Sequence, residues 1–114
     1  MTTIWHNPKC SKSREALALL EQKEEAVEVF KYLENSPSRD EIRALLAKLG
    51  VSARQLMRTK EDLYKELGLG AVEDEGKLID AMAKYPKLIE RPILIQGEKA
   101  IIGRPVEKVI DFLA

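Results

Sequence analysis

The sequence has few of the residues that hold small proteins together by cross-links or metals. Its 114 residues include one cysteine and one histidine. A single cysteine excludes a disulfide within the chain and points to a reducing compartment, so we expect a cytoplasmic protein. One Cys and one His also cannot supply the four ligands of a structural zinc site, and we expect no bound metal.

The sequence also lacks an excess of charge and a long apolar run. Lysine and arginine number 19, as do aspartate and glutamate, so the formal net charge is +0. Charge-driven binding to nucleic acid or to anionic membranes usually needs a basic excess, so we expect neither partner. No run approaches the ~18 apolar residues of a transmembrane helix. No basic segment followed by an apolar one begins the chain, and we expect no secretory signal.

The residues that are present predict an ordinary folded core. The chain is 45% hydrophobic and 33% charged, and its length fits a single domain spanning residues 1–114. Hydrophobic periodicity predicts an α/β protein in the order β-α-β, a helical region, then β-β-α. The expected strands are 2–6, 27–33, 93–95 and 100–102, and the expected helices are 11–22, 39–49, 53–58, a segment around 78–85, and a last helix opened by Pro105.

The middle of the chain, about 37–85, is predicted to be mostly helical, and we interpret it as an insertion into a single core. Ser38 and Glu41 match a capping box, and Gly50 is placed to end the helix that they begin. The segment Leu67–Gly70 is predicted to be a loop. A helix between the first two strands favours a parallel pair, whereas the last two strands are expected to form an antiparallel hairpin.

Cys10 is the most informative residue, because it lies between the first strand and the first helix. The first turn of a helix has unpaired N–H groups and a positive dipole, and both favour a thiolate. Such sites lower the thiol pKa from ~8.5 to roughly 3.5–7.5. Lys9, Lys12 and Arg14 add positive charge nearby. A lone cysteine is often a small buried apolar residue, but these polar neighbours would make a poor core. We therefore interpret Cys10 as a reactive nucleophile.

Four short motifs resemble those of the ArsC family, the glutaredoxin-linked arsenate reductases of arsenic detoxification. They occur in the family's order along essentially the whole chain. The motifs are HNPKCSKSR at 6–14, YLENSPS at 32–38, ERPI at 90–93 and GRP at 103–105. The resemblance implies a thioredoxin-like core with a mixed sheet, interrupted by the helical insertion.

The resemblance also implies a reaction centre of one cysteine and three arginines. Cys10 matches the nucleophile, and Arg58, Arg91 and Arg104 match the arginines that bind the substrate. His6 matches a family histidine that could tune the thiol or could simply be a polar strand end. Arg91–Pro92 falls where thioredoxin folds place a cis-proline. The implied substrates are arsenate and glutathione, the implied protein partner is glutaredoxin, and we expect no bound cofactor and a monomer.

The implied chemistry suits these residue types. Arsenate is an anion, so a thiolate that attacks it meets Coulomb repulsion, which arginines offset while holding the oxygens in a planar, bidentate geometry. An external thiol is needed, because the position of a second sulfur in a Cys-x-x-Cys motif is occupied by Ser13. Taken singly, each arginine could instead form a weak surface ion pair. That interpretation is kept for four arginines on expected solvent-exposed helix faces: Arg14, Arg39, Arg43 and Arg54.

Other functions remain open on sequence grounds. A glutathione-dependent thiol oxidoreductase with another substrate would need Cys10 but not all three arginines. A regulator that binds RNA polymerase, as Spx-type proteins of this fold do, would need no catalysis, although a dithiol switch is impossible here. Low-molecular-weight phosphatases need an arginine six positions after the cysteine, where this chain has Ala16, and are set aside.

Overall fold

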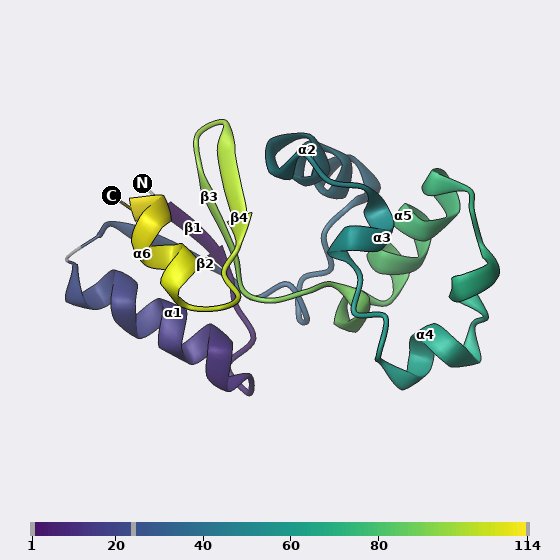
Figure 1. Cartoon of the computed structure of the whole chain (residues 1–114), viewed down its shortest axis with the longest axis horizontal. Helices are drawn as coiled ribbons and strands as arrows, with labels where there is room; N and C mark the ends of the chain where they lie inside the picture. The colour runs from purple at the N-terminus through teal and green to yellow at the C-terminus, as the bar shows by residue number, and fades with distance from the viewer. Residues whose placement is uncertain (1, 24, 114) are drawn as a thin grey trace. The chain divides into compact units, whose positions relative to one another are not determined.

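The computed structural model describes residues 2–23 and 25–113, and these divide into two compact units (Figure 1). The sheet unit comprises the described residues of Met1–Asn35 and Arg91–Ala114, and the helical unit comprises Ser36–Glu90. A single domain with an insertion at 37–85 stays a prediction. None of the helices in the described residues is long and apolar enough to cross a membrane.

The sheet unit contains a four-stranded mixed sheet in the order β2-β1-β3-β4. Its strands are β1 (Thr2–Trp5), β2 (Val27–Phe30), β3 (Ile93–Gln96) and β4 (Lys99–Ile102). β1 and β2 are parallel, as a helical crossover between them predicts, and β3 is antiparallel to both β1 and β4. The predicted hairpin is confirmed: β3 and β4 pair at Gln96 and Lys99, and Gly97 supplies the positive φ of 56° that the tight turn requires.

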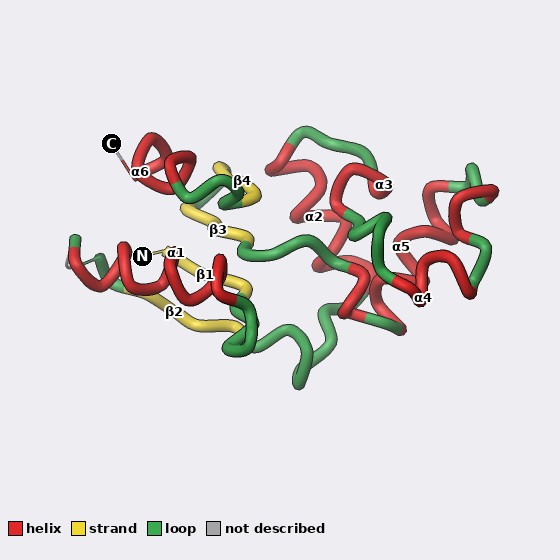
Figure 2. Tube along the Cα trace, turned by 60° about the horizontal axis from the view of Figure 1, so that its bottom comes forward, coloured by secondary structure: helices red, strands yellow, loops and turns green. Residues whose placement is uncertain are grey.

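Two helices of the sheet unit, α1 (Ser11–Gln22) and α6 (Glu107–Leu113), pack on the sheet (Figure 2). Ala16 and Leu20 lie four residues apart on one face of α1, and both are fully buried against Ile4 of β1 and Leu94 of β3. Val109 of α6 completes this core. The predicted bounds of α1 are confirmed at both ends.

Two expected boundaries in the sheet unit are wrong. β2 ends at Phe30, not at residue 33. Tyr32 lies outside the strand, and its buried ring stacks on that of Trp5 with ring centroids 6.3 Å apart. The last helix begins at Glu107, two residues after Pro105. The Arg104–Pro105 peptide bond is cis, as is the Arg91–Pro92 bond that the resemblance implies. β2 ends where its partner strand β1 ends, with Phe30 opposite Trp5, and this pairing has no signal in the local sequence.

The helical unit consists of short helices joined by tight turns. They are α2 (Arg39–Leu49), α3 (Ala53–Leu56), α4 (Asp62–Glu66), the 3-10 turn η1 (Leu69–Ala71), α5 (Glu75–Lys84) and the 3-10 turn η2 (Pro86–Leu88). The predicted capping box is present: Glu41 N–H donates to Ser38 Oγ at 3.1 Å, and Ser38 N–H donates to Glu41 Oε1 at 3.0 Å. Gly50 ends α2 with a φ of 68°.

The sequence prediction missed α4 and η1, and it misassigned Arg54. Arg54 is half-buried rather than on a solvated face. Its guanidinium donates to the Tyr64 hydroxyl, to the Leu69 carbonyl at 3.1 Å and to the Val72 carbonyl. These bonds bring together residues 10 to 18 positions apart, so helical periodicity gives no sign of them. By contrast, the ion pair of Arg39 with Asp80 is on the surface, as expected for that arginine.

Gly103 lets the end of β4 approach the start of β3, where its N–H donates to the Pro92 carbonyl at 2.8 Å. A Cβ atom at residue 103 would lie 3.1 Å from Pro92 Cγ and from Val109 Cγ2. Because such overpacking forces neighbours to shift, Gly103→Ala is expected to lower the free energy of unfolding by roughly 1–3 kcal/mol, measured by urea denaturation. Gly70→Ala is the control, since its Cβ would make only ordinary contacts. Equal stability of the two variants would contradict the predicted crowding.

Candidate active site

Cys10 is the N-cap residue of α1, and its backbone is extended (φ −95°, ψ 122°). The loop from the end of β1 turns there, because the Cys10 N–H donates to the Asn7 carbonyl at 3.0 Å. The Cys10 carbonyl then accepts the first helical hydrogen bond, from the Arg14 N–H. The thiol is half-buried. The strand-to-helix junction predicted for Cys10 is therefore present, and it presents the sulfur to the first turn of the helix.

The surroundings of Cys10 lower its pKa below that of an ordinary thiol. Burial alone would raise the pKa, but the Ser13 N–H, the Arg91 guanidinium and the Lys12 N–H act together to lower it. The Cys10 side chain does not form the hydrogen bond of a helix cap. The three donors nevertheless stabilise the thiolate relative to the thiol. The helix terminus acts as the sequence predicts, and the cation beside the sulfur is Arg91.

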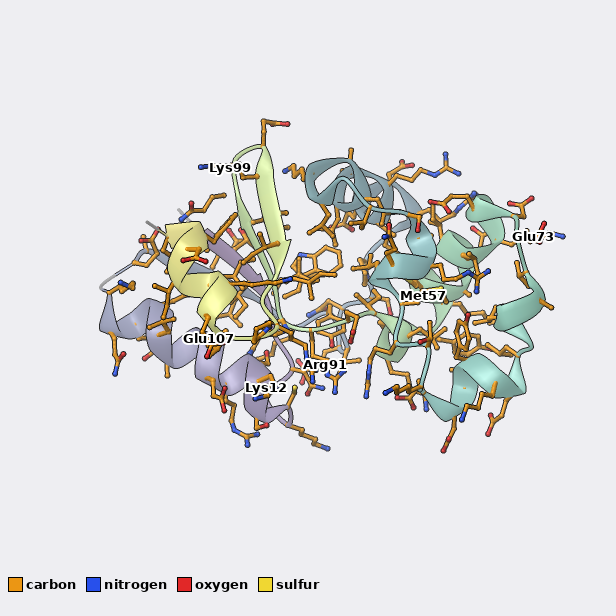
Figure 3. The ribbon with its side chains drawn as sticks, in the orientation of Figure 1. Lys12, Met57, Glu73, Arg91, Lys99 and Glu107 are labelled. Atoms are coloured by element: carbon orange, nitrogen blue, oxygen red, sulfur yellow. The ribbon has the colours of Figure 1, made fainter. Side chains whose placement is uncertain are left out.

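Arg91 reaches the sulfur because of strand pairing. It lies two residues before β3, and β3 runs antiparallel to β1 with Ile93 opposite Trp5. The start of β3 is therefore beside the end of β1, from which the loop to Cys10 departs. The Arg91 guanidinium interacts with the Cys10 sulfur both as a hydrogen-bond donor and as a charge. Figure 3 shows Arg91 near the N-terminal end of α1, where Lys12 is labelled.

Arg104 lies at the same edge of the sheet as Arg91. Ile93 pairs with Ile102, and the Gly103 N–H continues the pairing to Pro92, so Arg104 comes opposite the approach to β3. Arg104 is half-buried. Among the described residues, it is not one of the groups that set the pKa of Cys10. The structure thus brings Arg91 to the sulfur and Arg104 to the neighbouring strand end.

Arg58 belongs to the helical unit. Its backbone N–H donates to the Leu88 carbonyl at 2.7 Å, next to the isolated bridge between Met57 and Ile89. Its guanidinium lies 3.1 Å from Glu61 Oε2 and donates to the Lys87 carbonyl at 3.4 Å. That Arg58 lies close to Cys10 stays a prediction.

His6 is buried, with 6% of its surface exposed, and it follows β1 directly. Its Nδ1 lies 2.7 Å from the Ser13 hydroxyl oxygen. Burial lowers the pKa of His6, and the positive charges of Lys31 and Arg14 lower it further. Both effects favour the neutral imidazole, and the contact with Ser13 ties His6 to the first turn of α1.

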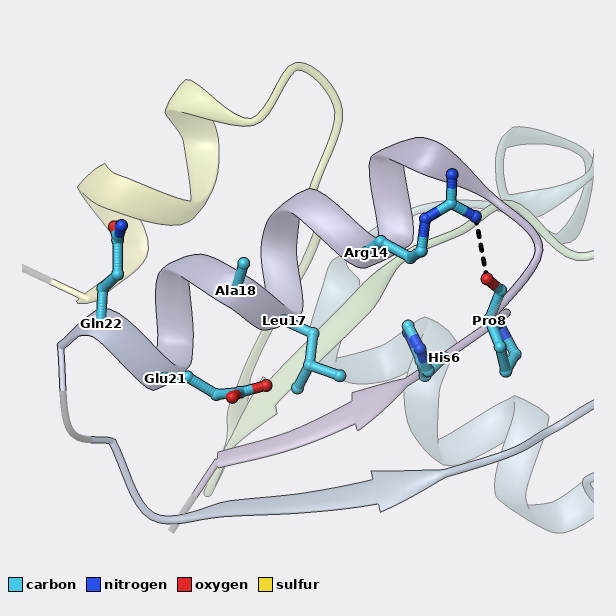
Figure 4. Close-up of a pocket in the computed structure, with 7 residues that line it drawn as sticks. All are labelled: His6, Pro8, Arg14, Leu17, Ala18, Glu21 and Gln22. Carbon is cyan, nitrogen blue, oxygen red and sulfur yellow. Dashed lines mark hydrogen bonds between the residues drawn. The ribbon is translucent and has the colours of Figure 1, made fainter.

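Three further residues fix the loop, and sequence analysis gave none of them this role. Ser13 Oγ accepts the Asn7 N–H at 3.0 Å, and the Asn7 side chain accepts the Lys9 N–H at 3.0 Å. Arg14, expected on a solvated face, is exposed but donates to the Pro8 carbonyl at 2.9 Å (Figure 4). An Asn-Pro pair is a known turn signal and could have suggested the Asn7 bond. A shallow depression runs from His6 along the exposed side of α1.

The arrangement can hold a small oxyanion next to a thiolate. The Arg91 guanidinium interacts with the sulfur, the N–H groups of Ser13 and Lys12 at the start of α1 favour its charged form, and a second arginine lies at the adjacent strand end. In residues 2–23 and 25–113, no three His, Cys, Asp or Glu side chains gather as a metal cluster. A cysteine at the N-cap of the first helix, beside a four-stranded mixed sheet in the order β2-β1-β3-β4, is the arrangement of a thioredoxin-like thiol protein.

Comparisons with known proteins identify the family. The sequence profile of the ArsC family matches residues 5–112. An arsenate reductase from Neisseria meningitidis is 51% identical over 108 residues, which cover 93% of this chain and 92% of that protein. One from Haemophilus influenzae is 47% identical, covering 96% and 97% of the two chains. The solved arsenate reductase from Vibrio cholerae has a TM-score of 0.93 at 53% identity, over 96% of this chain and 95% of that one. This chain belongs to the ArsC family.

Proposed function

We propose that this chain is an arsenate reductase in which Cys10 is the nucleophile. The observation that carries the proposal is the contact of the Arg91 guanidinium with a thiol whose pKa is lowered at the start of α1. A thiolate, not a thiol, attacks arsenic, and a fixed cation offsets the repulsion between the two anions. Family relatives that are about half identical and match nearly end to end carry the name arsenate reductase.

The first step forms a bond between sulfur and arsenic. The Cys10 thiolate attacks As(V) of dihydrogen arsenate, and one arsenate oxygen leaves as water after taking up a proton. Arsenic keeps its oxidation state in this step. Arg91 binds the arsenate oxygens and keeps the arsenic next to the attacking sulfur. Arg104 and Arg58 would bind the remaining oxygens, a role that rests on the resemblance to the ArsC family alone.

The reduction needs two external thiols, because the chain has one cysteine. The glutathione thiol attacks arsenic next and displaces a second oxygen as water. A glutaredoxin thiolate then attacks the glutathione sulfur. The bond between arsenic and that sulfur breaks, and its electron pair stays on arsenic, which becomes As(III). Glutaredoxin leaves as a mixed disulfide with glutathione. Water finally cleaves the Cys10–arsenic bond, which releases arsenite and the free thiol. Because these thiols work in a reducing compartment, the proposal includes a cytoplasmic location.

The proposal is tested by arsenate-dependent oxidation of NADPH in the presence of glutathione, glutathione reductase and glutaredoxin. We expect turnover that requires this protein, glutathione and glutaredoxin together, since each supplies one sulfur. Phosphate is the control anion, because it cannot accept the two electrons. Absence of turnover, with the coupling enzymes shown to be active on a glutathione mixed disulfide, would contradict the proposal and favour a thiol oxidoreductase with another substrate.

A further inference from the structure

The hydroxyl of Ser13 is the most completely buried polar group beside the thiol. Ser13 has no exposed surface, although it lies in the first turn of α1. Its hydroxyl oxygen has two partners from the preceding loop, the Asn7 N–H at 3.0 Å and His6 Nδ1 at 2.7 Å. Its backbone N–H faces the Cys10 sulfur. One residue therefore connects the end of β1, the loop and the thiol.

Counting hydrogens decides the direction of the bond between Ser13 and His6. The Asn7 N–H can only donate, so Ser13 Oγ accepts there. The hydroxyl has one hydrogen, and with Ser13 fully buried the partner that the structure provides for it is His6 Nδ1. His6 then accepts at Nδ1 and carries its proton on Nε2. A second proton on His6 would sit on Nδ1 and leave the hydroxyl hydrogen without this acceptor, a cost that buried polar groups avoid.

We propose that Ser13 is a positioning residue whose hydroxyl holds His6 in the Nε2–H form and ties the loop to α1, so that the Cys10 sulfur stays against the first-turn N–H groups. The inference rests on the proposed function only in taking Cys10 as the nucleophile. It also gives a reason for a serine at the position that a second sulfur occupies in Cys-x-x-Cys proteins. A thiol is a weak donor and a weak acceptor and would hold both partners poorly.

The positive charges around His6 act in the same direction. Lys31, just after β2, and Arg14, on α1, both disfavour a protonated imidazole. The Ser13 hydroxyl, in addition, selects which of the two neutral tautomers is present. The charges alone would not make that choice.

The tautomer can be measured in the unmodified protein by ¹⁵N NMR of the single histidine. We expect an unprotonated Nδ1 and a protonated Nε2 at neutral pH. A protonated Nδ1 would overturn the proposal, and this measurement needs no variant and no arsenate.

The positioning role is tested by a pair of variants of equal shape. Ser13→Thr keeps the hydroxyl and Ser13→Val does not, and both add bulk to the same buried site. The readout is the pH midpoint of iodoacetamide alkylation, which reports the one thiol of the chain. We expect the midpoint of Ser13→Val to exceed that of Ser13→Thr by about half a pH unit or more, or ~threefold less thiolate at neutral pH. The tautomer signal should also be lost only in Ser13→Val.

Ser11→Ala is the matched control, because Ser11 is an exposed serine in the same turn. It should leave both readouts unchanged. Equal midpoints for the threonine and valine variants would overturn the positioning role, whether or not arsenate is reduced. The expected difference between the two midpoints, together with no arsenate turnover by the wild type, would support the positioning role of Ser13 and contradict the proposed function instead.

Discussion

Cys10→Ser is expected to abolish arsenate reduction, down to the rate of the assay mixture without this protein. A serine hydroxyl stays protonated under conditions in which the Cys10 thiol, with its lowered pKa, ionises. The chain holds no other cysteine that could form the bond to arsenic. The substitution changes one atom in a half-buried position, so the fold should persist.

The measurement is the coupled NADPH assay, together with mass spectrometry after iodoacetamide treatment. Wild type should gain one label and Cys10→Ser none, which confirms that the reactive thiol has been removed. Ser11→Ala serves as the active control in the same turn. Turnover by Cys10→Ser at the wild-type rate would remove Cys10 as the nucleophile.

Arg91→Gln is expected to have the second largest effect, and Arg91→Lys a smaller one. The Arg91 guanidinium both lowers the pKa of Cys10 and, in the proposed reaction, holds arsenate. Charge-assisted hydrogen bonds contribute ~1.5–3 kcal/mol each, so losing one should lower kcat/KM roughly 10- to 160-fold. Lysine keeps the charge but not the planar fork and should recover part of this loss.

The pH profile separates the two roles of Arg91. Without the guanidinium, the pKa of Cys10 rises toward the ~8.5 of a free thiol, so the thiolate fraction at neutral pH falls. Raising the pH should therefore restore the alkylation rate of Arg91→Gln fully but its arsenate turnover only in part, because anion binding is still lost. Arg43→Lys, at an exposed arginine of α2, is the matched control. An unchanged alkylation midpoint in Arg91→Gln would contradict the role of Arg91 at the sulfur.

Much of the local structure could be predicted because neighbouring residues encode it. The apolar spacing of Ala16 and Leu20 defines α1, and the Ser38–Glu41 box and Gly50 define α2 at both ends. The structure differs where distant residues decide. Arg54, in α3, donates to the carbonyls of Leu69, the first residue of η1, and of Val72, which follows η1. Helical periodicity gives no sign of these bonds.

The same difference between local and distant signals applies to the candidate site. Its thiol was found from sequence, because a strand followed by a helix is a local pattern. The loop contacts of Arg14 and Ser13 were missed, since both side chains belong to a helix but bond to residues that precede it. Resemblance to a family supplied Arg58, Arg91 and Arg104, and no spacing in the sequence would have selected them from the other arginines.

The sequence by itself determined that a single thiol stands at the beginning of a helix, where unpaired N–H groups favour its ionised form. Only the tertiary structure decided which cation accompanies it. Arg91 is 81 positions away along the chain, and it reaches the sulfur of Cys10 because β3 pairs antiparallel with β1 and starts where β1 ends. Strand register depends on which apolar faces are buried together, and that is a property of the folded core rather than of any segment.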